Sequence, residues 1–278
     1  MIYKYLVAAD MDNTLIPPYS DITEKSMQAI KNLRSHGIAF TFATGRSHYM
    51  TGTYIDKLEI DVPIIACNGG TLYDPLSKNC IYSKEFTPTQ VKNILGMCFA
   101  SANFIDVTGY SSKGIYVRKE SCRNDFFDNY NAKAKPEFKI PLFNLEPSVL
   151  SIPDSDFPCF TKLLIIDAPG SFTDIIKNNS EFEVVSSAAG FCDIMPAGQT
   201  KGEGLKRVAK HLNIPLENTF AFGDSDNDKS MLTAAGLGIA MENSTKDILE
   251  IADAVTLSCV DDGFAYGIDN IVLPRVLK

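Results

Sequence analysis

Both ends of the chain alternate short apolar runs with amphipathic segments, whereas the middle does not. Apolar runs of strand length occur at Tyr3–Ala9, Ile38–Ala43 and Val62–Cys67, with a helical pattern at Thr23–Ser35. The alternation returns after Lys201. Alternating strands and helices are typical of a parallel sheet covered by crossover helices. The sequence therefore predicts an α/β fold with a Rossmann-like, doubly wound parallel-sheet core.

The pattern changes after Asn68-Gly69-Gly70 to that of an antiparallel hairpin, with Asp74-Pro75 at its turn. A helix is expected at Thr89–Ala100, followed by strands and by a polar stretch at 123–158 that has no clear period. The simplest arrangement is one core domain formed by residues 1–80 and 191–278. Residues 81–190 then form an inserted α/β domain.

Two aspartates directly follow the first predicted strand, in Asp10-Met11-Asp12-Asn13-Thr14-Leu15. Open α/β sheets bind ligands at the carboxyl ends of their strands. Two carboxylates two residues apart repel each other unless a cation or a proton lies between them. The motif therefore predicts a metal or acid–base site, and the alternative is a polar loop that caps the first helix.

A second acidic motif, Gly223-Asp224-Ser225-Asp226-Asn227-Asp228, follows a predicted strand at Thr219–Phe222. Three carboxylates that converge on a strand end are costly without a divalent cation. Acidic capping of the next helix would explain one of these aspartates, but not all three.

Two further segments supply groups that suit a phosphate. Thr44-Gly45-Arg46 follows the second strand and offers a hydroxyl group, a permissive backbone and a helix N-terminus. Lys201 begins a predicted helix and could place its ammonium group opposite the carboxylates. Taken alone, the first segment is an ordinary strand-to-helix turn and Lys201 is a solvated side chain; the combination favours a phosphate site.

Charge and cysteine content exclude several classes of protein. With 26 basic and 34 acidic residues the formal net charge is −8, which argues against nucleic acid or an anionic membrane as the main partner. No apolar run approaches the length of a membrane-spanning helix. The seven cysteines show no C-x-x-C spacing, so reduced thiols in a cytoplasmic protein are expected. Nothing in the pattern specifies an oligomeric state.

Together these motifs resemble the haloacid dehalogenase-like hydrolases, specifically the Cof-type branch with a large α/β cap (type IIB). The similarity covers the whole chain in order, as the following motifs show: Asp10 to Leu15, Thr44-Gly45-Arg46, Asn68-Gly69, Lys201-Gly202, Gly223-Asp224 through Asn227-Asp228, and Asp262-Gly263. The resemblance implies that the inserted domain is a cap, which closes over the site and selects the substrate. Its polar candidates for that task are Arg118, Lys119 and Arg123.

The resemblance also implies a role for each motif. Asp10 would be the nucleophile, and Asp12 would protonate the leaving group and later activate water. Mg²⁺ would bind a carboxylate oxygen of Asp10, the backbone carbonyl of Asp12 and Asp224, with Asp228 in or next to that shell. The expected phosphate-binding groups are the backbone amides of Met11 and Gly45 together with Thr44, Lys201 and Asn227.

The implied function is magnesium-dependent hydrolysis of a small phosphorylated metabolite, such as a sugar phosphate. A phosphomutase of the same superfamily and a phosphate-sensing protein without turnover are the alternatives, and the presence of Asp12 argues against the sensor. Two positions depart from the family pattern. Asn13 replaces a glycine, but Asn tolerates a left-handed backbone, and Glu242-Asn243-Ser244 replaces Gly-Asn-Ala.

Overall fold

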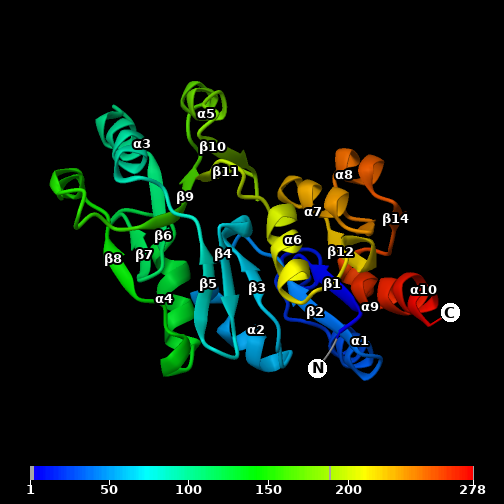
Figure 1. Ribbon diagram of the computed structural model, residues 1–278. Helices are drawn as coiled ribbons and strands as arrows, with labels where there is room; N and C mark the ends of the chain where they lie inside the picture. Colours follow the sequence, from blue (N-terminus) through cyan, green and yellow to red (C-terminus); the bar gives the residue numbers. More distant parts are fainter. Residues whose placement is uncertain (1–2, 188, 278) are drawn as a thin grey trace.

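A parallel sheet forms the core of the protein (Figure 1). The computed structural model describes residues 3–187 and 189–277. The strand order in this sheet is β14-β13-β12-β1-β2, and all four pairings are parallel. Helices α6 and α7 lie on one face of the sheet, and α1 and α9 lie on the other. This is the predicted doubly wound arrangement.

The core strands are β1 (Tyr5–Ala9), β2 (Ile38–Phe42), β12 (Thr219–Gly223), β13 (Leu237–Ala240) and β14 (Ala254–Val255). The core helices are α1 (Glu24–Ser35), α2 (Gly52–Lys57), α6 (Lys201–His211), α7 (Lys229–Ala234), α8 (Lys246–Ile251), α9 (Gly263–Gly267) and α10 (Leu273–Val276). Every residue of β2 and β12 is buried, as expected for strands covered on both faces.

Local sequence explains where α1 begins and ends. The Thr23 side chain accepts a hydrogen bond from the backbone N–H of Ser26, so it caps the first turn. Ala29, Ile30 and Leu33 are buried against the sheet. Gly37 follows the helix with a φ of +69°, a left-handed conformation that suits glycine. The predicted helix at Thr23–Ser35 is therefore confirmed to within one residue.

A three-stranded sheet, β3 (Ile64–Ala66), β4 (Thr71–Asp74) and β5 (Asn79–Ser83), continues from the core. An isolated parallel bridge between Ala43 and Ile65 joins it to the edge of the core sheet. The predicted hairpin is present as β4 and β5. This sheet leads the chain out of the core and into the inserted region.

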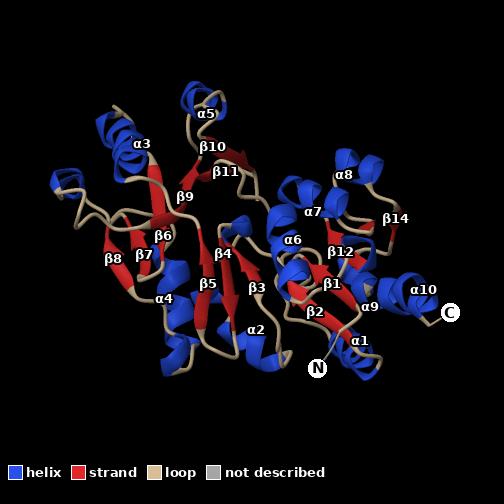
Figure 2. Cartoon of the chain, viewed as in Figure 1, coloured by secondary structure: helices blue, strands red, loops and turns tan. Residues whose placement is uncertain are grey.

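The inserted region contains a separate mixed sheet with the strand order β10-β11-β9-β6-β7-β8 (Figure 2). Its strands are β6 (Asp106–Ser111), β7 (Gly114–Val117), β8 (Leu142–Asn144), β9 (Phe160–Ile166), β10 (Phe182–Val185) and β11 (Phe191–Pro196). Its helices are α3 (Pro88–Ala100), α4 (Asn124–Lys133) and α5 (Gly170–Lys177). The predicted α/β core with a separate inserted α/β unit is therefore correct.

The domain limits at residues 80–81 and 190–191 stay a prediction. β11 pairs with β9 and β10, so the sheet of the inserted region continues to Pro196. This pairing favours a boundary after Pro196, and we use "cap" below for residues 84–196. Among the described residues, no helix is both long and apolar enough to cross a membrane.

Candidate active site

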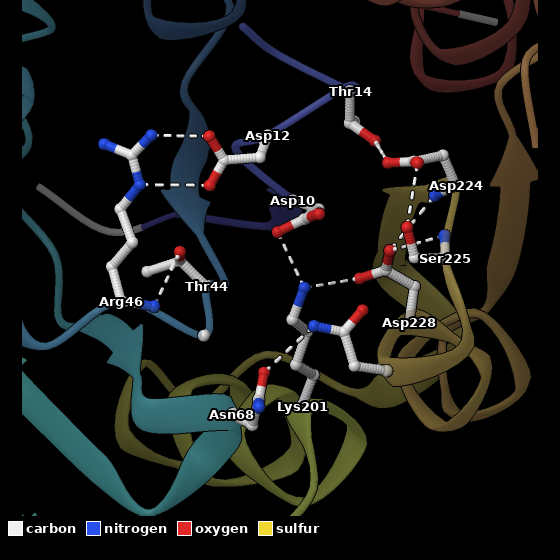
Figure 3. A network of polar contacts seen from close by, with 12 residues as sticks. Asp10, Asp12, Thr14, Thr44, Arg46, Asn68, Lys201, Asp224, Ser225 and Asp228 are labelled. Carbon is white, nitrogen blue, oxygen red and sulfur yellow. Dashed lines mark hydrogen bonds and ion pairs between the residues drawn. The ribbon is translucent and has the colours of Figure 1, made fainter. Parts of the chain in front are cut away.

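Asp10 and Lys201 meet at the carboxyl end of the core sheet, although 191 positions separate them in the chain (Figure 3). Asp10 follows β1, and its backbone N–H donates to the carbonyl of Phe222 in β12 at 2.9 Å. The Nζ of Lys201 donates to Asp10 Oδ1 at 2.6 Å and to Asp228 Oδ1 at 2.7 Å. The Lys201 side chain is 0% exposed, so it is not the solvated lysine of the alternative interpretation.

Asp224 lies beside this ion-pair network and is held by two hydroxyl groups. Thr14 Oγ1 donates to Asp224 Oδ1 at 2.7 Å, and Ser225 Oγ donates to Asp224 Oδ2 at 2.9 Å. Asp228 Oδ2 accepts the backbone N–H groups of Asp224 and Ser225 at 3.0 and 3.1 Å. Asp228 thus fixes the loop backbone with one oxygen and Lys201 with the other.

The three carboxylates of Asp10, Asp224 and Asp228 are buried and close together. One oxygen from each lies within 4.8 Å of the others. Burial, followed by the charge of Asp228, raises the pKa of Asp10 well above its usual range and that of Asp224 to about 6. Such clustering of oxygen donors is costly for the protein alone and suits a hard divalent cation. The residues present therefore fit a divalent metal ion.

Lys201 balances part of this negative charge. Burial alone would lower the pKa of its ammonium group, but the neighbouring carboxylates of Asp10 and Asp228 outweigh burial and raise it. Lys201 is thus a fixed cation. Three carboxylates against one ammonium group leave an excess of negative charge, which a divalent ion would neutralise.

Asp226, the middle of the three aspartates in the Gly223–Asp228 motif, does not join the cluster. It is exposed and begins a short 3₁₀ turn at Asp226–Asp228. Ser225 and Asp228 form a capping box around that turn. The expectation that three carboxylates of this motif converge is wrong: two face the site, and one faces solvent.

The carboxylate of Asp12 points away from Asp10 and pairs with Arg46 (Figure 3). Arg46 Nε donates to Asp12 Oδ2 at 3.0 Å, and a second guanidinium nitrogen donates to Oδ1. The Asp12 side chain is 53% exposed. Asp12 therefore stands at the mouth of the site, where a rotation of its side chain would turn the carboxylate toward a bound ligand.

Asn13, next to Asp12, has a φ of +60°, so the left-handed backbone expected of it is present. Asn243 Nδ2 donates to the Asn13 carbonyl at 3.0 Å. Asn243 Oδ1 accepts the backbone N–H of Cys259 at 2.8 Å. Although Glu242 and Ser244 on either side of it depart from the family pattern, Asn243 links the Asp10 loop to the C-terminal part of the core.

Three of the predicted phosphate-binding residues, Thr44, Asn227 and Met11, follow core strands directly or closely. Thr44 is buried, and its Oγ1 accepts the backbone N–H of Arg46 at 3.1 Å. Asn227 Nδ2 donates to Asn68 Oδ1 at 3.1 Å, while Asn227 Oδ1 is buried without a partner. The Met11 carbonyl accepts the backbone N–H groups of Leu15 and Ile16 at 3.0 and 2.7 Å, which closes the Asp10 loop.

Gly69 sets the distance between the Asn68 turn and Lys201. Its φ is +95°, and a Cβ atom there would lie 2.0 Å from the carbonyl oxygen of Thr200, which caps α6. Only glycine permits this approach. The predicted Asn68-Gly69 motif therefore acts by positioning the first turn of α6, in which Lys201 lies.

A cavity of about 250 Å³ joins the acidic cluster to the cap. The core contributes Asp10, Asp12, Gly45, Arg46 and Asn227 to its lining. The cap contributes Tyr110, Arg123, Phe126, Lys162, Leu164, Ser187 and Phe191. The site therefore lies between the core and the cap, and both line it.

Lys162 in β9 holds the cap to the core. Its Nζ donates to the Gly45 carbonyl at 2.7 Å and to Asp193 Oδ1 at 2.5 Å. Both partners of this ion pair are nearly inaccessible. Burial alone would lower the pKa of Lys162, but the Asp193 carboxylate raises it. The cap thus contacts the Thr44-Gly45-Arg46 turn through a buried cation.

Sequence reasoning missed four residues of this site: Thr14, Arg46, Lys162 and Asp193. Thr14 and Arg46 lie inside recognised motifs, so their polar side chains next to the named residues were a usable signal. Lys162 and Asp193 lie within largely apolar strands. A charged residue in a buried strand requires a partner, which was the available signal.

A model of the haloacid dehalogenase-like hydrolases matches residues 7–268. The chain belongs to this family. Phosphatase YwpJ of Bacillus subtilis (strain 168) is 29% identical over 289 residues, which cover 96% of this chain and 99% of YwpJ. The 5-amino-6-(5-phospho-D-ribitylamino)uracil phosphatase YwtE of the same organism is 29% identical, with 96% and 97% covered. This haloacid dehalogenase-like hydrolase is thus a phosphatase, that is, a phosphoric monoester hydrolase.

The structure of the sugar phosphatase BT4131, of haloacid dehalogenase subclass IIB, superposes with a TM-score of 0.79 at 21% identity, with 95% of this chain and 98% of that one covered. At this identity the similarity concerns the fold. The hydrolase therefore has the core and the large α/β cap of the Cof-type, subclass IIB branch, as the motif order predicted.

Proposed function

We propose that the protein is a magnesium-dependent phosphatase that hydrolyses a small phosphorylated metabolite, such as a sugar phosphate, through an aspartyl-phosphate on Asp10. The observation that carries this proposal is the buried cluster of Asp10, Asp224 and Asp228 with Lys201 at its centre. The cavity of about 250 Å³ suits a small substrate, since pockets for drug-sized ligands begin near 300 Å³. YwtE, a relative, is named for a phosphorylated small molecule.

Asp10 is positioned for nucleophilic attack on phosphorus. Its backbone is fixed to β12, and Lys201 holds one carboxylate oxygen at 2.6 Å, which leaves the other oxygen to attack. The ester oxygen would then leave with a proton, and water would cleave the acyl-phosphate. Lys201 also neutralises charge on the phosphoryl oxygens during both steps.

Asp12 supplies the proton for the leaving group and later activates water. Its exposed carboxylate must turn from Arg46 toward the cavity to do so. Arg46 also lines the cavity and can then bind the substrate. The pair thus exchanges a contact within the protein for contacts with the ligand.

Mg²⁺ would be held by Asp10, Asp224 and the backbone carbonyl of Asp12, with Asp228 at the edge of the shell because Lys201 and two backbone amides already bind its oxygens. When bound, the ion would neutralise charge on the phosphoryl group. Thr14 and Ser225 orient Asp224 for this role.

Thr44, Asn227, Lys201 and the backbone amides of Met11 and Gly45 would bind the phosphoryl oxygens. Met11, Thr44, Gly45 and Asn227 follow β1, β2 and β12, whereas Lys201 begins α6, so these groups come from separate elements. Positioning of this kind is the main contribution of a protein to phosphoryl transfer.

The test is hydrolysis of p-nitrophenyl phosphate with Mg²⁺ and with EDTA. We expect turnover only with the metal ion, and loss of at least about 100-fold in Asp10→Asn. Asp224→Asn should require more Mg²⁺, whereas Asp226→Asn is a matched control from the same loop, since its carboxylate faces solvent. Full activity of Asp10→Asn would refute the covalent mechanism.

A broad panel of phosphorylated metabolites separates the alternatives. Absence of magnesium-dependent turnover on every member would favour the sensor. Activity that depends on an added sugar bisphosphate and releases no inorganic phosphate would favour the phosphomutase.

A further inference from the structure

Three basic residues of the cap loop, Arg118, Lys119 and Arg123, were candidates for substrate selection, and the structure separates them. Arg118 donates through one guanidinium nitrogen to the Ile105 carbonyl at 2.8 Å, and it lies over the rings of Phe99 and Phe104. Lys119 is exposed. Of these three, only Arg123 lines the cavity that contains Asp10.

The guanidinium group of Arg123 has no hydrogen bond or ion pair within residues 3–187 and 189–277. Its Nε is buried without a partner. A buried donor without an acceptor costs free energy, so such a group in a native structure requires an explanation. A ligand that occupies the cavity would supply the missing acceptor.

Aromatic rings surround the guanidinium group of Arg123. It lies 4.3 Å from the ring centroid of Phe126, 5.2 Å from that of Phe127 and 5.7 Å from that of Phe191. Rings bind the face of a guanidinium group and leave its N–H edge free. That edge presents parallel donors, which match the two oxygens of a carboxylate or a phosphate.

The neighbouring cation does not compete for such a ligand. Lys162 also lines the cavity, but its charge is paired with Asp193 at 2.5 Å. Burial raises the pKa of the Tyr110 hydroxyl, while the charges of Lys162 and Arg123 lower it, so both cations act on Tyr110. Among the described residues of the cap that line this cavity, Arg123 is therefore the cation whose charge no carboxylate balances.

We propose that Arg123 is a specificity-determining residue, which binds a second oxyanion, a carboxylate or a phosphate, on the leaving group of the substrate. This inference rests on the proposed function and names the class of substrate: a short phosphomonoester that carries a further acidic group. The volume of about 250 Å³ must hold the phosphoryl group as well, so the rest of the molecule is small.

Pairs of substrates that differ only in the acidic group test this inference. One pair is 3-phosphoglycerate and glycerol 3-phosphate, and the other is 6-phosphogluconate and glucitol 6-phosphate. A member with two phosphates, glucose 1,6-bisphosphate against glucose 6-phosphate, distinguishes phosphate from carboxylate. We expect kcat/KM to favour an acidic member at least about 10-fold in the wild type, as for one charged hydrogen bond.

Arg123→Gln should reduce that preference roughly 10- to 100-fold, mainly through KM. Arg123→Lys should retain part of the preference, since lysine keeps the positive charge but lacks the two parallel N–H donors of the guanidinium group. Arg118→Gln is the matched control, because it removes a ring-stacked arginine from the same loop but outside the cavity. Thermal unfolding of each variant is the control for a folding defect. An unchanged preference in Arg123→Gln, or equal use of neutral and acidic members by the wild type, would overturn the inference.

The same pairs can be tested without turnover. Calorimetric binding to Asp10→Asn, with and without Arg123→Gln, reports the acidic preference even if hydrolysis fails. Failure of all phosphate release would refute the proposed function alone. Release of phosphate from p-nitrophenyl phosphate, combined with no acidic preference in binding or turnover, would refute the role of Arg123 alone.

Discussion

Replacement of Lys201 by methionine should destabilise the core and make its stability depend on metal ions. Met is similar in length but carries no charge, so Asp10 and Asp228 would lose a partner at 2.6 and 2.7 Å. Removal of one partner from a buried ion pair costs about 3–5 kcal/mol. For a chain of this size each kcal/mol lowers the unfolding midpoint by roughly 2–4 °C. We therefore expect a midpoint about 6–20 °C lower for Lys201→Met.

Mg²⁺ should recover much of this loss, because it can neutralise the carboxylates that Lys201 no longer balances. At a concentration 100-fold above its dissociation constant, the ion stabilises the native state by about 2.7 kcal/mol. Unfolding is best followed by circular dichroism, since the chain has no tryptophan. Activity should fall by roughly 100-fold or more even with saturating Mg²⁺, because Lys201 is the cation that we propose to neutralise charge on the phosphoryl group.

Lys162→Met is the matched control for this experiment. It also removes a buried ammonium group from a short ion pair, the one with Asp193 at 2.5 Å, but that pair lies in the cap. We expect a similar loss of stability without the added response to Mg²⁺. The reasoning is refuted if Lys201→Met unfolds at the wild-type temperature, or if Mg²⁺ stabilises both variants equally.

Three other substitutions test separate parts of the structure. Gly69→Ala should destabilise the protein by at least about 2 kcal/mol, because φ is +95° and a backbone oxygen would lie 2.0 Å from the new Cβ. Gly96→Ala is the control: Gly96 lies on α3 with open space around it, so this change should stabilise the protein by about 0.5–1 kcal/mol. Thermal unfolding measures both effects. Burial lowers the pKa of His48 to about 4, so below about pH 6.5 the unfolded chain binds a proton on this residue and the native state does not. The free energy of unfolding of the wild type should therefore fall by up to about 2 kcal/mol relative to that of His48→Gln between pH 7 and pH 5. A difference between the two proteins that stays constant with pH would contradict this. Arg46→Gln should cost no more than about 1 kcal/mol in urea unfolding, because its partner Asp12 is 53% exposed; a much larger loss would mean that this pair is structural.

The core elements could be predicted because their periods are strong. The strands before Asp10 and Asp224 are short apolar runs, so the position of both carboxylates at one sheet edge followed from parallel topology. Helix α4 was not predicted, because Phe127 is its one buried residue among those described and its other positions are largely polar. A helix that buries so little has no readable apolar face.

The side-chain directions within the motifs could not be predicted. The Asp12 carboxylate turns to Arg46 rather than to Asp10, which depends on a rotamer and on a partner from another strand end. Asp226 faces solvent because the chain enters a 3₁₀ turn at that position. Spacing along the sequence states which residues reach the site, but not which way each one points.

The central position of β1 in its sheet bears on how the protein is made. β1 lies between β2 and β12, so one of its two neighbours begins at Thr219. At about 5–20 residues per second, a ribosome needs roughly 10–40 s to translate the intervening chain. During that time one edge of β1 has no strand to pair with, and Asp224 and Asp228, which share the buried cluster with Asp10, have not yet been made. The nascent polypeptide thus cannot assemble the buried cluster of Asp10, Asp224 and Asp228 until residue 228 has been translated.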